Sequence, residues 1–273
     1  MSVVRIEHVC KDYLLGDQKV QALKDITLAF DRGVFLAIAG PSGSGKTTLL
    51  NLIGCIDTPT SGKIFINDRD VSGRTPDQLA DLRARTIGFI FQTFNLLPVL
   101  SAAENVEYPL LQRKEMSAAD RKRRVDYFLD IVGLAKYASH RPNQLSGGQR
   151  QRVAIARALV IKPAIVLADE PTANLDHKTG EEILLLMKKI NRALKTTFIF
   201  STHDKRVIAK ADRLVRVEDG EIALLGVRSQ SRWSVARHRP PEASGSESPT
   251  SAPSEASAAA GENSNADHEK TDD

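Results

Sequence analysis

Long hydrophobic runs and closely spaced cysteines are both missing from this chain of 273 residues. No apolar run approaches the ~20 residues that a membrane-spanning helix needs, and the N-terminus lacks a charged segment followed by an apolar one. The two cysteines, Cys10 and Cys55, have neither the spacing of a close pair nor that of a metal site. We therefore expect a soluble protein whose cysteines are small buried side chains in a reducing compartment.

Basic residues and large apolar residues are scarce at the C-terminal end. Residues 240–273 contain eight Asp and Glu but only one Lys, with no Ile, Leu, Val or aromatic residue, whereas residues 1–239 carry 37 basic and 26 acidic residues. Such a tail cannot bury enough apolar surface to fold, so we predict a disordered acidic tail over 240–273. An alternative is that it folds back onto the basic remainder or binds a partner. Residues 228–239, which include Trp233, are predicted to be a basic linker, with contact to a membrane surface as the alternative.

Aromatic residues are also missing from the exposed side of the most basic segment. Residues 117–132 are predicted to form a helix with Ser117 as its N-cap and Asp120 at the capping-box position. Its apolar face is expected to consist of Tyr127, Phe128, Ile131 and Val132. The basic residues around this helix then form its solvated side: Arg113, Lys114, Arg121, Lys122, Arg123 and Arg124. Nearby anionic lipid would also suit them, but nucleic-acid binding is not expected because the aromatic platforms are buried.

A glycine-rich loop is the first strong motif that is present. It fits the pattern G-x-x-x-x-G-K-[ST] and lies between a predicted apolar strand at 34–39 and the predicted first turns of a helix at 48–53. Its residues, with the one that follows, are Gly40, Pro41, Ser42, Gly43, Ser44, Gly45, Lys46, Thr47 and Thr48. The glycines let backbone N–H groups turn toward phosphate oxygens at a helix N-terminus. We expect Lys46 to reach the β- and γ-phosphates and Thr47 to bind Mg²⁺; an ordinary Gly/Ser turn fits the Lys-Thr pair poorly.

An acidic pair follows a second apolar strand, at residues 165–168. Strands of this composition lie at the centre of parallel sheets, and ligands bind at their carboxyl ends. Asp169 is therefore expected to hold Mg²⁺ through water, and Glu170 to orient and deprotonate an attacking water. The alternative, a solvated strand end before Pro171, is disfavoured by the glycine-rich loop upstream.

A third motif, Leu145-Ser146-Gly147-Gly148-Gln149, precedes a predicted helix over 149–160 with an apolar stripe. Ser146 and the amides of Gly147 and Gly148 would form a second anion-binding helix N-terminus. Since this helix and the one after Lys46 begin at different places, one nucleotide cannot easily use both ends within one subunit. A second subunit is therefore expected.

Taken in this order, the motifs resemble those of the nucleotide-binding subunits of the ATP-binding cassette (ABC) family, over roughly residues 3–225. The resemblance implies that Tyr13 stacks on adenine, that Gln92 contacts Mg²⁺ and the attacking water, and that His203 contacts the γ-phosphate. It also implies that Asp176, in the D-loop at 173–176, belongs to the nucleotide site. In this family the motif of Ser146 to Gln149 completes the site of the other subunit, so two ATP molecules lie between the subunits of a head-to-tail homodimer. An active, Mg²⁺-dependent ATP hydrolase is expected.

The amino-acid sequences of the segments 88–98 and 104–110 resemble those of the lipoprotein-releasing and macrolide-export group, the LolD/MacB type. This implies a separate membrane permease with few helices and a large extracytoplasmic domain. The chain would then lie at the cytoplasmic face of the inner membrane, bound through that permease, and serve lipoprotein release or the export of macrolide-like or peptide substrates. A DNA-maintenance ATPase would need a long coiled coil between Lys46 and Ser146, but no heptad run fits there. A translation-factor type would need two cassettes, but this chain has one glycine-rich loop and one Ser146 motif. An ATPase that regulates a membrane complex without transport stays an alternative.

The predicted fold class is α/β: a P-loop NTPase core with a mostly parallel sheet, an antiparallel N-terminal β subdomain and a helical insert. The ABC domain is expected over 1–227 and its helical subdomain over about 93–150. We expect a type I′ hairpin at the Asp-Gly of 219–220 and a helix over 76–85 that starts at Thr75 and Pro76. The other predicted strands are 3–7, 26–30, 63–66, 87–91 and 198–201.

Overall fold

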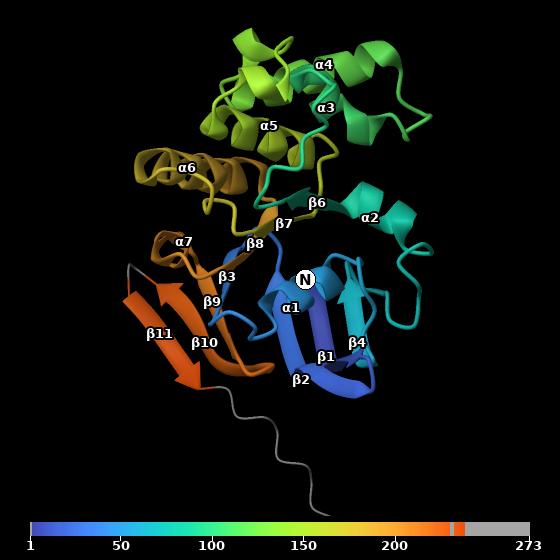
Figure 1. The fold of residues 1–273 in the computed structure, drawn as a ribbon, viewed down its shortest axis with the longest axis vertical. Helices are drawn as coiled ribbons and strands as arrows, with labels where there is room; N and C mark the ends of the chain where they lie inside the picture. The colour runs from blue at the N-terminus through green and yellow to red at the C-terminus, as the bar shows by residue number, and fades with distance from the viewer. Residues whose placement is uncertain (1, 230–231, 238–273) are drawn as a thin grey trace, which may run out of the picture. The chain divides into compact units, whose positions relative to one another are not determined.

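The computed structural model describes residues 2–229 and 232–237, and the tail predicted for 240–273 lies outside them. A seven-stranded sheet lies at the centre of the described region, in the order β11-β10-β9-β3-β8-β7-β6 (Figure 1). Strands β6, β7, β8, β3 and β9 run parallel, and β10 and β11 are antiparallel to their neighbours. Their bounds are Ile87–Ile90 (β6), Ile165–Asp169 (β7), Thr197–Thr202 (β8), Phe35–Ala39 (β3), Arg213–Glu218 (β9), Glu221–Ser229 (β10) and Arg232–Arg237 (β11). The mostly parallel α/β sheet is confirmed.

The central strands are apolar on both faces because both faces are covered. Phe35 and Ala37 of β3 pack into a core that includes residues of helices α5 (Gly147–Leu159) and α6 (His177–Leu194). Leu36 and Ile38, which point the other way, pack with helix α1 (Lys46–Ile53) and the N-terminal strands. The sheet therefore lies between α5 and α6 on one face and α1 on the other (Figure 1).

A smaller antiparallel sheet forms the N-terminal part, in the order β2-β1-β4-β5. Its strands are Ser2–Leu15 (β1), Gln18–Asp31 (β2), Ser61–Ile66 (β4) and Arg69–Asp70 (β5). The predicted strands at 3–7 and 26–30 are present but extend much further. Register shifts, with His8 and Asp25 at positive φ, break the alternation that marks a strand in the sequence.

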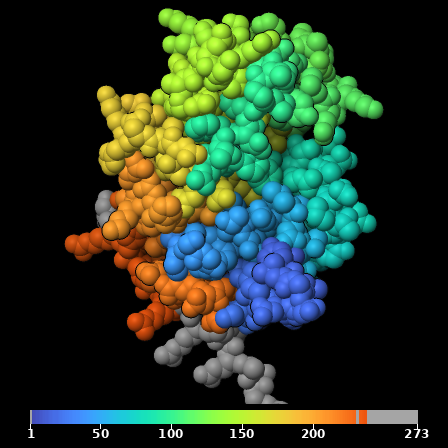
Figure 2. Space-filling view, in the orientation of Figure 1, coloured from blue at the N-terminus to red at the C-terminus, as the bar shows by residue number. Residues whose placement is uncertain are grey.

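The remaining helices are α2 (Ala80–Thr86), α3 (Ala102–Glu107), α4 (Ala118–Ile131) and α7 (Lys205–Lys210), with 3₁₀ turns at Tyr108–Leu110, Ala135–Tyr137 and Pro142–Gln144. Of these, α3 and α4 form one layer with α5, whereas α2 lies beside β6 and α7 beside β3 (Figure 1). Helices α3, α4 and α5 share one apolar core. In the space-filling view, their green residues and the blue residues of the N-terminal sheet lie at opposite ends (Figure 2). No helix among the described residues is both long enough and apolar enough to cross a membrane.

Two predicted helix starts are displaced. The predicted helix over 76–85 begins only at Ala80, although Thr75 and Gln78 exchange the hydrogen bonds of a capping box one turn earlier. Leu79, the N-cap of α2, follows this turn with a non-helical ψ, so the turn and the helix are separate. The helix predicted from Gln149 begins two residues earlier, at Gly147, because Ser146 is its N-cap. The hairpin at Asp219 and Gly220 is confirmed, with both residues at positive φ.

The predicted basic linker over 228–239 is wrong for the residues that the structure describes. Residues Arg232–Arg237 form β11, which pairs antiparallel with β10. Trp233 lies against Gly226, where an added Cβ would come within 3.1 Å of the indole ring, so the ring fills the space that glycine leaves. The arginines and serines of this segment interrupt the apolar pattern by which a strand is recognised in a sequence.

Helix α4 starts at the predicted N-cap, Ser117, which accepts a hydrogen bond from the Asp120 amide. Its buried face is made by Val125, Phe128 and Leu129, whereas Tyr127, predicted to be buried, is 52% exposed.

Of the two cysteines that were predicted to be buried, Cys55 is buried, and burial raises its pKa to about 11. Cys10 is only half-buried, so that expectation is wrong.

Candidate nucleotide site

The loop of residues 40–45 is pressed between two other segments of the chain. Gly40 has φ +156°, and an added Cβ would lie 2.0 Å from the Val217 carbonyl oxygen. Gly45 has φ +100°, and its added Cβ would lie 2.6 Å from the Ala22 carbonyl oxygen. Only glycine fits at these positions. The sequence motif therefore forms a tight loop between β9 and β2.

The N-terminus of α1 is open toward this loop. Gly45 is the N-cap, no side chain caps the helix, and its first turn carries no acidic residue. The Lys46 ammonium group donates to the Pro41 carbonyl across the loop, over 2.6 Å. Ser44 is 3% exposed, and its hydroxyl has no partner among the described residues. Free amides, a cation and an unpartnered hydroxyl are groups that bind the oxygens of a phosphate.

The acidic pair lies at the carboxyl end of β7, beside β8 and near the loop. Burial raises the pKa of Asp169, and the charge of Glu170 adds to this effect; the nearby Ser201 hydroxyl and the positive charge of Lys46 lower it. A half-buried carboxylate close to a second negative charge favours a bound cation. The described residues contain no group of three or more His, Cys, Asp or Glu that could hold a metal. A cation here would depend on one or two side chains and on phosphates, as Mg²⁺ commonly does.

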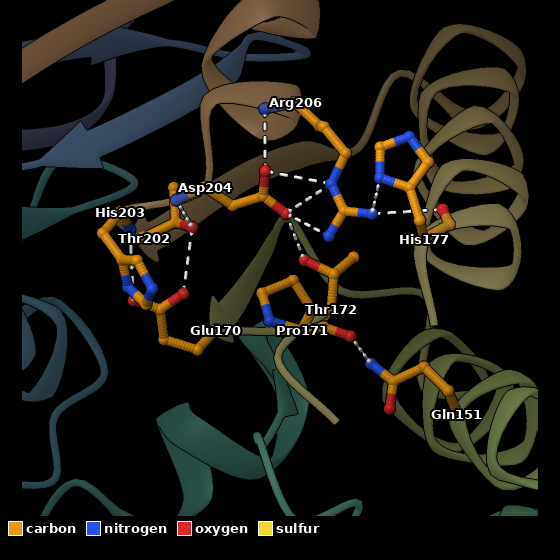
Figure 3. Close-up of polar contacts among 9 residues, drawn as sticks. All are labelled: Gln151, Glu170, Pro171, Thr172, His177, Thr202, His203, Asp204 and Arg206. Atoms are coloured by element: carbon orange, nitrogen blue, oxygen red, sulfur yellow. Dashed lines mark hydrogen bonds and ion pairs between the residues drawn. The ribbon is translucent and has the colours of Figure 1, made fainter. Parts of the chain in front are cut away.

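The Glu170 carboxylate is held by the two residues that end β8 and follow it. Thr202 donates its hydroxyl to Glu170 Oε2 over 3.0 Å, and the His203 amide donates to Oε1 over 3.1 Å (Figure 3). The His203 Nδ1 atom also lies 2.5 Å from Oε1. The His203 side chain is 78% exposed, whereas that of Glu170 is 15% exposed. The predicted base and the predicted phosphate-contacting histidine therefore lie together, with the histidine facing solvent.

Tyr13 lies beside the start of α1. Its hydroxyl donates to Asp57 Oδ2 over 2.7 Å, and the Lys11 ammonium group lies 4.8 Å from the ring centre. Burial, together with the hydrogen bond to Asp57, raises the pKa of Tyr13 to about 12, while the nearby Thr48 hydroxyl lowers it. The hydroxyl edge of the ring is therefore fixed next to the phosphate loop.

A Tyr13→Phe variant tests this arrangement by its pH dependence. A phenol with a raised pKa stabilises the fold below about pH 10, its unfolded value, and loses that contribution as the pH rises toward about 12. We expect the unfolding free energy of the unsubstituted protein to fall more steeply between these pH values than that of the variant. Parallel curves in denaturant titrations would contradict the Tyr13–Asp57 bond. If the ring stacks on adenine, as the family resemblance implies, the variant should bind ATP with unchanged affinity.

The remaining predicted residues lie on two connected loops. Gln92 follows β6, and its carbonyl oxygen accepts a hydrogen bond from the Asn174 side chain over 2.9 Å. Asp176 is the N-cap of α6 and accepts from the Thr179 amide over 3.0 Å. The structure therefore gives Asp176 a helix-capping role that the sequence did not suggest.

The Ser146 motif lies apart from the phosphate loop. Ser146 and Gln149 exchange hydrogen bonds in a capping box at the start of α5. An added Cβ at Gly148 would lie 2.5 Å from Thr179 Cγ2, so the motif packs against the start of α6. Helix α5 belongs to the upper layer of Figure 1 and α1 to the opposite side of the sheet. The predicted site residues thus form two groups: the loop with Asp169, Glu170 and His203, and the Ser146 motif with Asp176.

Several residues that contact Glu170 or the segment after it were not predicted from the sequence. They are Gln151, Thr172, Thr202, Asp204 and Arg206 (Figure 3). Only their positions near motif residues could have indicated them, because the contacts Thr172–Asp204, Gln151–Pro171 and Arg206–His177 join segments that are distant in the sequence.

Comparison with known proteins decides the family. Residues 23–173 match the sequence profile described as "ABC transporter". The chain belongs to the ABC transporter family. This ABC protein is 46% identical over 223 residues to the uncharacterized ABC transporter ATP-binding protein MJ0796 of Methanocaldococcus jannaschii, covering 81% of the chain and 95% of the relative. It is also 46% identical over 220 residues to the macrolide export ATP-binding/permease protein MacB of Brucella melitensis, but spans only 34% of that protein.

Solved structures agree with this membership. A dimeric post-hydrolysis structure of the MJ0796 cassette, bound to ADP and Pi, superposes on the ABC chain with a TM-score of 0.74 at 43% identity, covering 87% of this chain and 99% of the other. A second dimeric structure of MJ0796 gives a TM-score of 0.73 at 45% identity, covering 80% and 96%. The predicted resemblance, the P-loop NTPase fold and the ATP-hydrolase class are confirmed.

Proposed function

We propose that this ABC protein binds and hydrolyses ATP as a head-to-tail homodimer and drives a separate membrane permease from the cytoplasmic face of the inner membrane. The observation that carries this proposal is that the predicted site residues form two separate groups on one chain. The phosphate loop, Glu170 and His203 follow the carboxyl ends of the parallel strands β3, β7 and β8, while the Ser146 motif packs against the start of α6. A second copy would bring its Ser146 motif to the first copy's loop, and the dimeric MJ0796 structures support such an assembly.

Each described residue then has a defined task. Tyr13 stacks on the adenine ring, and the amides of the loop, with Lys46, bind the phosphates once Lys46 leaves the Pro41 carbonyl. Thr47, Asp169 and Gln92 fit Mg²⁺, which would neutralise phosphate charge. Glu170, fixed by Thr202 and His203, accepts a proton from the attacking water. His203 and, from the second copy, Ser146, Gly147, Gly148 and Gln149 stabilise charge on the transferred phosphoryl group.

The permease is proposed to bind beside the Gln92 loop. A cavity of about 470 Å³ lies there, lined in part by Arg83, Phe91, Leu97, Tyr108 and Arg157. Exposed apolar side chains surround it: Leu97 at 37%, Val99 at 72%, Tyr108 at 52% and Leu111 at 55%. Such a patch is typical of a protein-binding surface. Its contact with the Gln92 loop would link the permease to the catalytic edge.

The first experiment is to trap Glu170→Gln protein with ATP in its native membranes and to identify copurifying proteins by mass spectrometry. A permease with few membrane helices and a large extracytoplasmic domain would support the LolD/MacB type, which the MacB relatives favour. Recovery of only soluble proteins or nucleic acid would contradict the transporter proposal.

A charge placed in the apolar patch should separate permease binding from hydrolysis. We expect Val99→Glu to reduce permease recovery about tenfold or more, because a buried unpaired charge costs over 1.4 kcal/mol. ATP hydrolysis by the isolated protein should stay unchanged. The control is Val227→Glu, which makes the same change at an exposed valine on β10. Equal recovery of the permease by both variants would place the docking surface elsewhere.

A further inference from the structure

A network of polar contacts surrounds the segment that follows Glu170 (Figure 3). Its centre is Asp204, the residue after His203. Asp204 Oδ1 accepts from the Arg206 backbone amide over 2.8 Å, which caps helix α7. Its other oxygen, Oδ2, accepts from the Thr172 hydroxyl over 2.9 Å and lies 2.7 Å from the Arg206 guanidinium group. Capping needs only the first oxygen, so the second oxygen serves another purpose.

Arg206 extends this network to helix α6. Its Nη1 atom donates to the His177 carbonyl oxygen over 3.1 Å. Gly180 leaves the room that this requires, since an added Cβ there would lie 3.0 Å from Nη1. The guanidinium group therefore connects Asp204 to the first turn of α6, directly after the segment 173–176.

Thr172 connects the same carboxylate to the catalytic edge. It is 1% exposed and lies two residues after Glu170. On its other side, the Pro171 carbonyl oxygen accepts from the side chain of Gln151, a fully buried residue of α5, over 2.9 Å. The peptide after Glu170 is thus held from both sides: by the helix of the Ser146 motif and by Asp204.

Glu170 itself needs such support. It has φ +43°, a conformation that a non-glycine residue adopts only when the surrounding structure enforces it. Asp204 acts on Glu170 a second time through Thr202, because the Asp204 amide donates to the Thr202 hydroxyl over 3.0 Å. The hydroxyl hydrogen is then directed at Glu170 Oε2, 3.0 Å away.

We propose that Thr172, Asp204 and Arg206 form a positioning clamp that fixes Glu170 for hydrolysis and ties it to the start of α6. This inference rests on the proposed role of Glu170 as the base. The clamp binds no nucleotide, and its three side chains act through Glu170 and the segment 171–177. Its loss lets the Glu170 carboxylate move away from the attacking water while the phosphate loop is untouched.

Three substitutions test the clamp by steady-state ATP hydrolysis. Asp204→Asn keeps the cap, since Asn caps helices as well as Asp, but turns an amide toward Arg206. Arg206→Gln and Thr172→Val remove one arm each. We expect kcat to fall about tenfold or more in each, since displacements near 1 Å cost up to ~10²-fold, with KM for ATP within about twofold. The Asp204→Asn/Arg206→Gln double variant should be no slower than the slower single variant.

Lys210→Gln is the matched control. It removes the 2.5 Å ion pair of Lys210 with Glu181, which also joins α7 to α6 but contacts neither Thr172 nor Asp204. We expect its kcat to equal that of the unsubstituted protein. Clamp variants that turn over like Lys210→Gln, with Glu170→Gln inactive, would overturn the clamp and leave the proposed function standing. A fully active Glu170→Gln protein would instead contradict the role of Glu170 as the base, and with it the clamp.

Discussion

Glu170→Gln protein binds ATP with unchanged affinity but hydrolyses it about 10²–10⁴ times more slowly, the range for loss of a general base. The two oxygens of Glu170 accept from different groups, Oε1 from the His203 amide and Oε2 from the Thr202 hydroxyl. In glutamine the remaining oxygen keeps the bond from the His203 amide, and the Thr202 hydroxyl can rotate to accept from the new NH2 group, so the side chain stays in place. It cannot take a proton from water. Phosphate release measures the first effect and nucleotide titration the second.

The control for this substitution is Glu181→Gln, which makes the same chemical change at an α6 residue paired with Lys210. It should hydrolyse ATP at the unsubstituted rate. Hydrolysis by Glu170→Gln at that same rate would show that another group activates the water.

Lys46→Ala protein loses ATP affinity itself. The Lys46 ammonium group has only one partner in the loop, the Pro41 carbonyl oxygen, and reorients at little cost toward a phosphate. A charge-assisted hydrogen bond contributes about 1.5–3 kcal/mol, so the dissociation constant should rise about 10- to 100-fold. Isothermal titration calorimetry measures this change directly.

Lys136→Ala is a suitable control for the lysine substitution, because Lys136 is exposed in a 3₁₀ turn of the helical layer, away from α1. Its ATP affinity should equal that of the unsubstituted protein. Unchanged affinity in the Lys46→Ala protein would mean that the loop amides alone bind the phosphates.

The motifs were predictable from sequence because each combines a local conformation with a chemical group. An apolar strand, a glycine loop and Lys46 follow one another directly, so their proximity needs no tertiary contact. The central parallel strands were equally clear, because each is apolar on both faces, as the buried Val166 and Phe198 show. The place of Glu170 followed from the rule that ligands bind at the carboxyl ends of parallel strands, whereas His203 was indicated only by the family resemblance.

Elements without a regular hydrophobic pattern were harder to predict. Strand β1 changes register near His8, which breaks its alternation. Strand β11 is exposed apart from the half-buried Trp233, and two of its six residues are arginines. Tyr127 was expected in the core because of its type, yet the buried face of α4 is filled by Phe128 and its neighbours. In each case tertiary packing overrides the local preference.

The clamp could not be derived from the sequence at all. Thr172 and Asp204 are 32 positions apart, and Gln151 reaches Pro171 across 20 positions. Nothing in the residue types distinguishes these contacts from those of ordinary surface polar groups. They become visible only once β7, β8 and the two helices are assembled.

The central claim is that the phosphate loop of one copy and the Ser146 motif of another form a single site. The most direct measurement is the molar mass of Glu170→Gln protein by light scattering, with and without saturating ATP. We predict a monomer without ATP, a dimer with ATP, and a monomer with bound ATP when Ser146→Arg is added to the same protein. An ATP-saturated Glu170→Gln protein that stays monomeric, or a Ser146→Arg variant that still dimerises with ATP, would contradict the shared site.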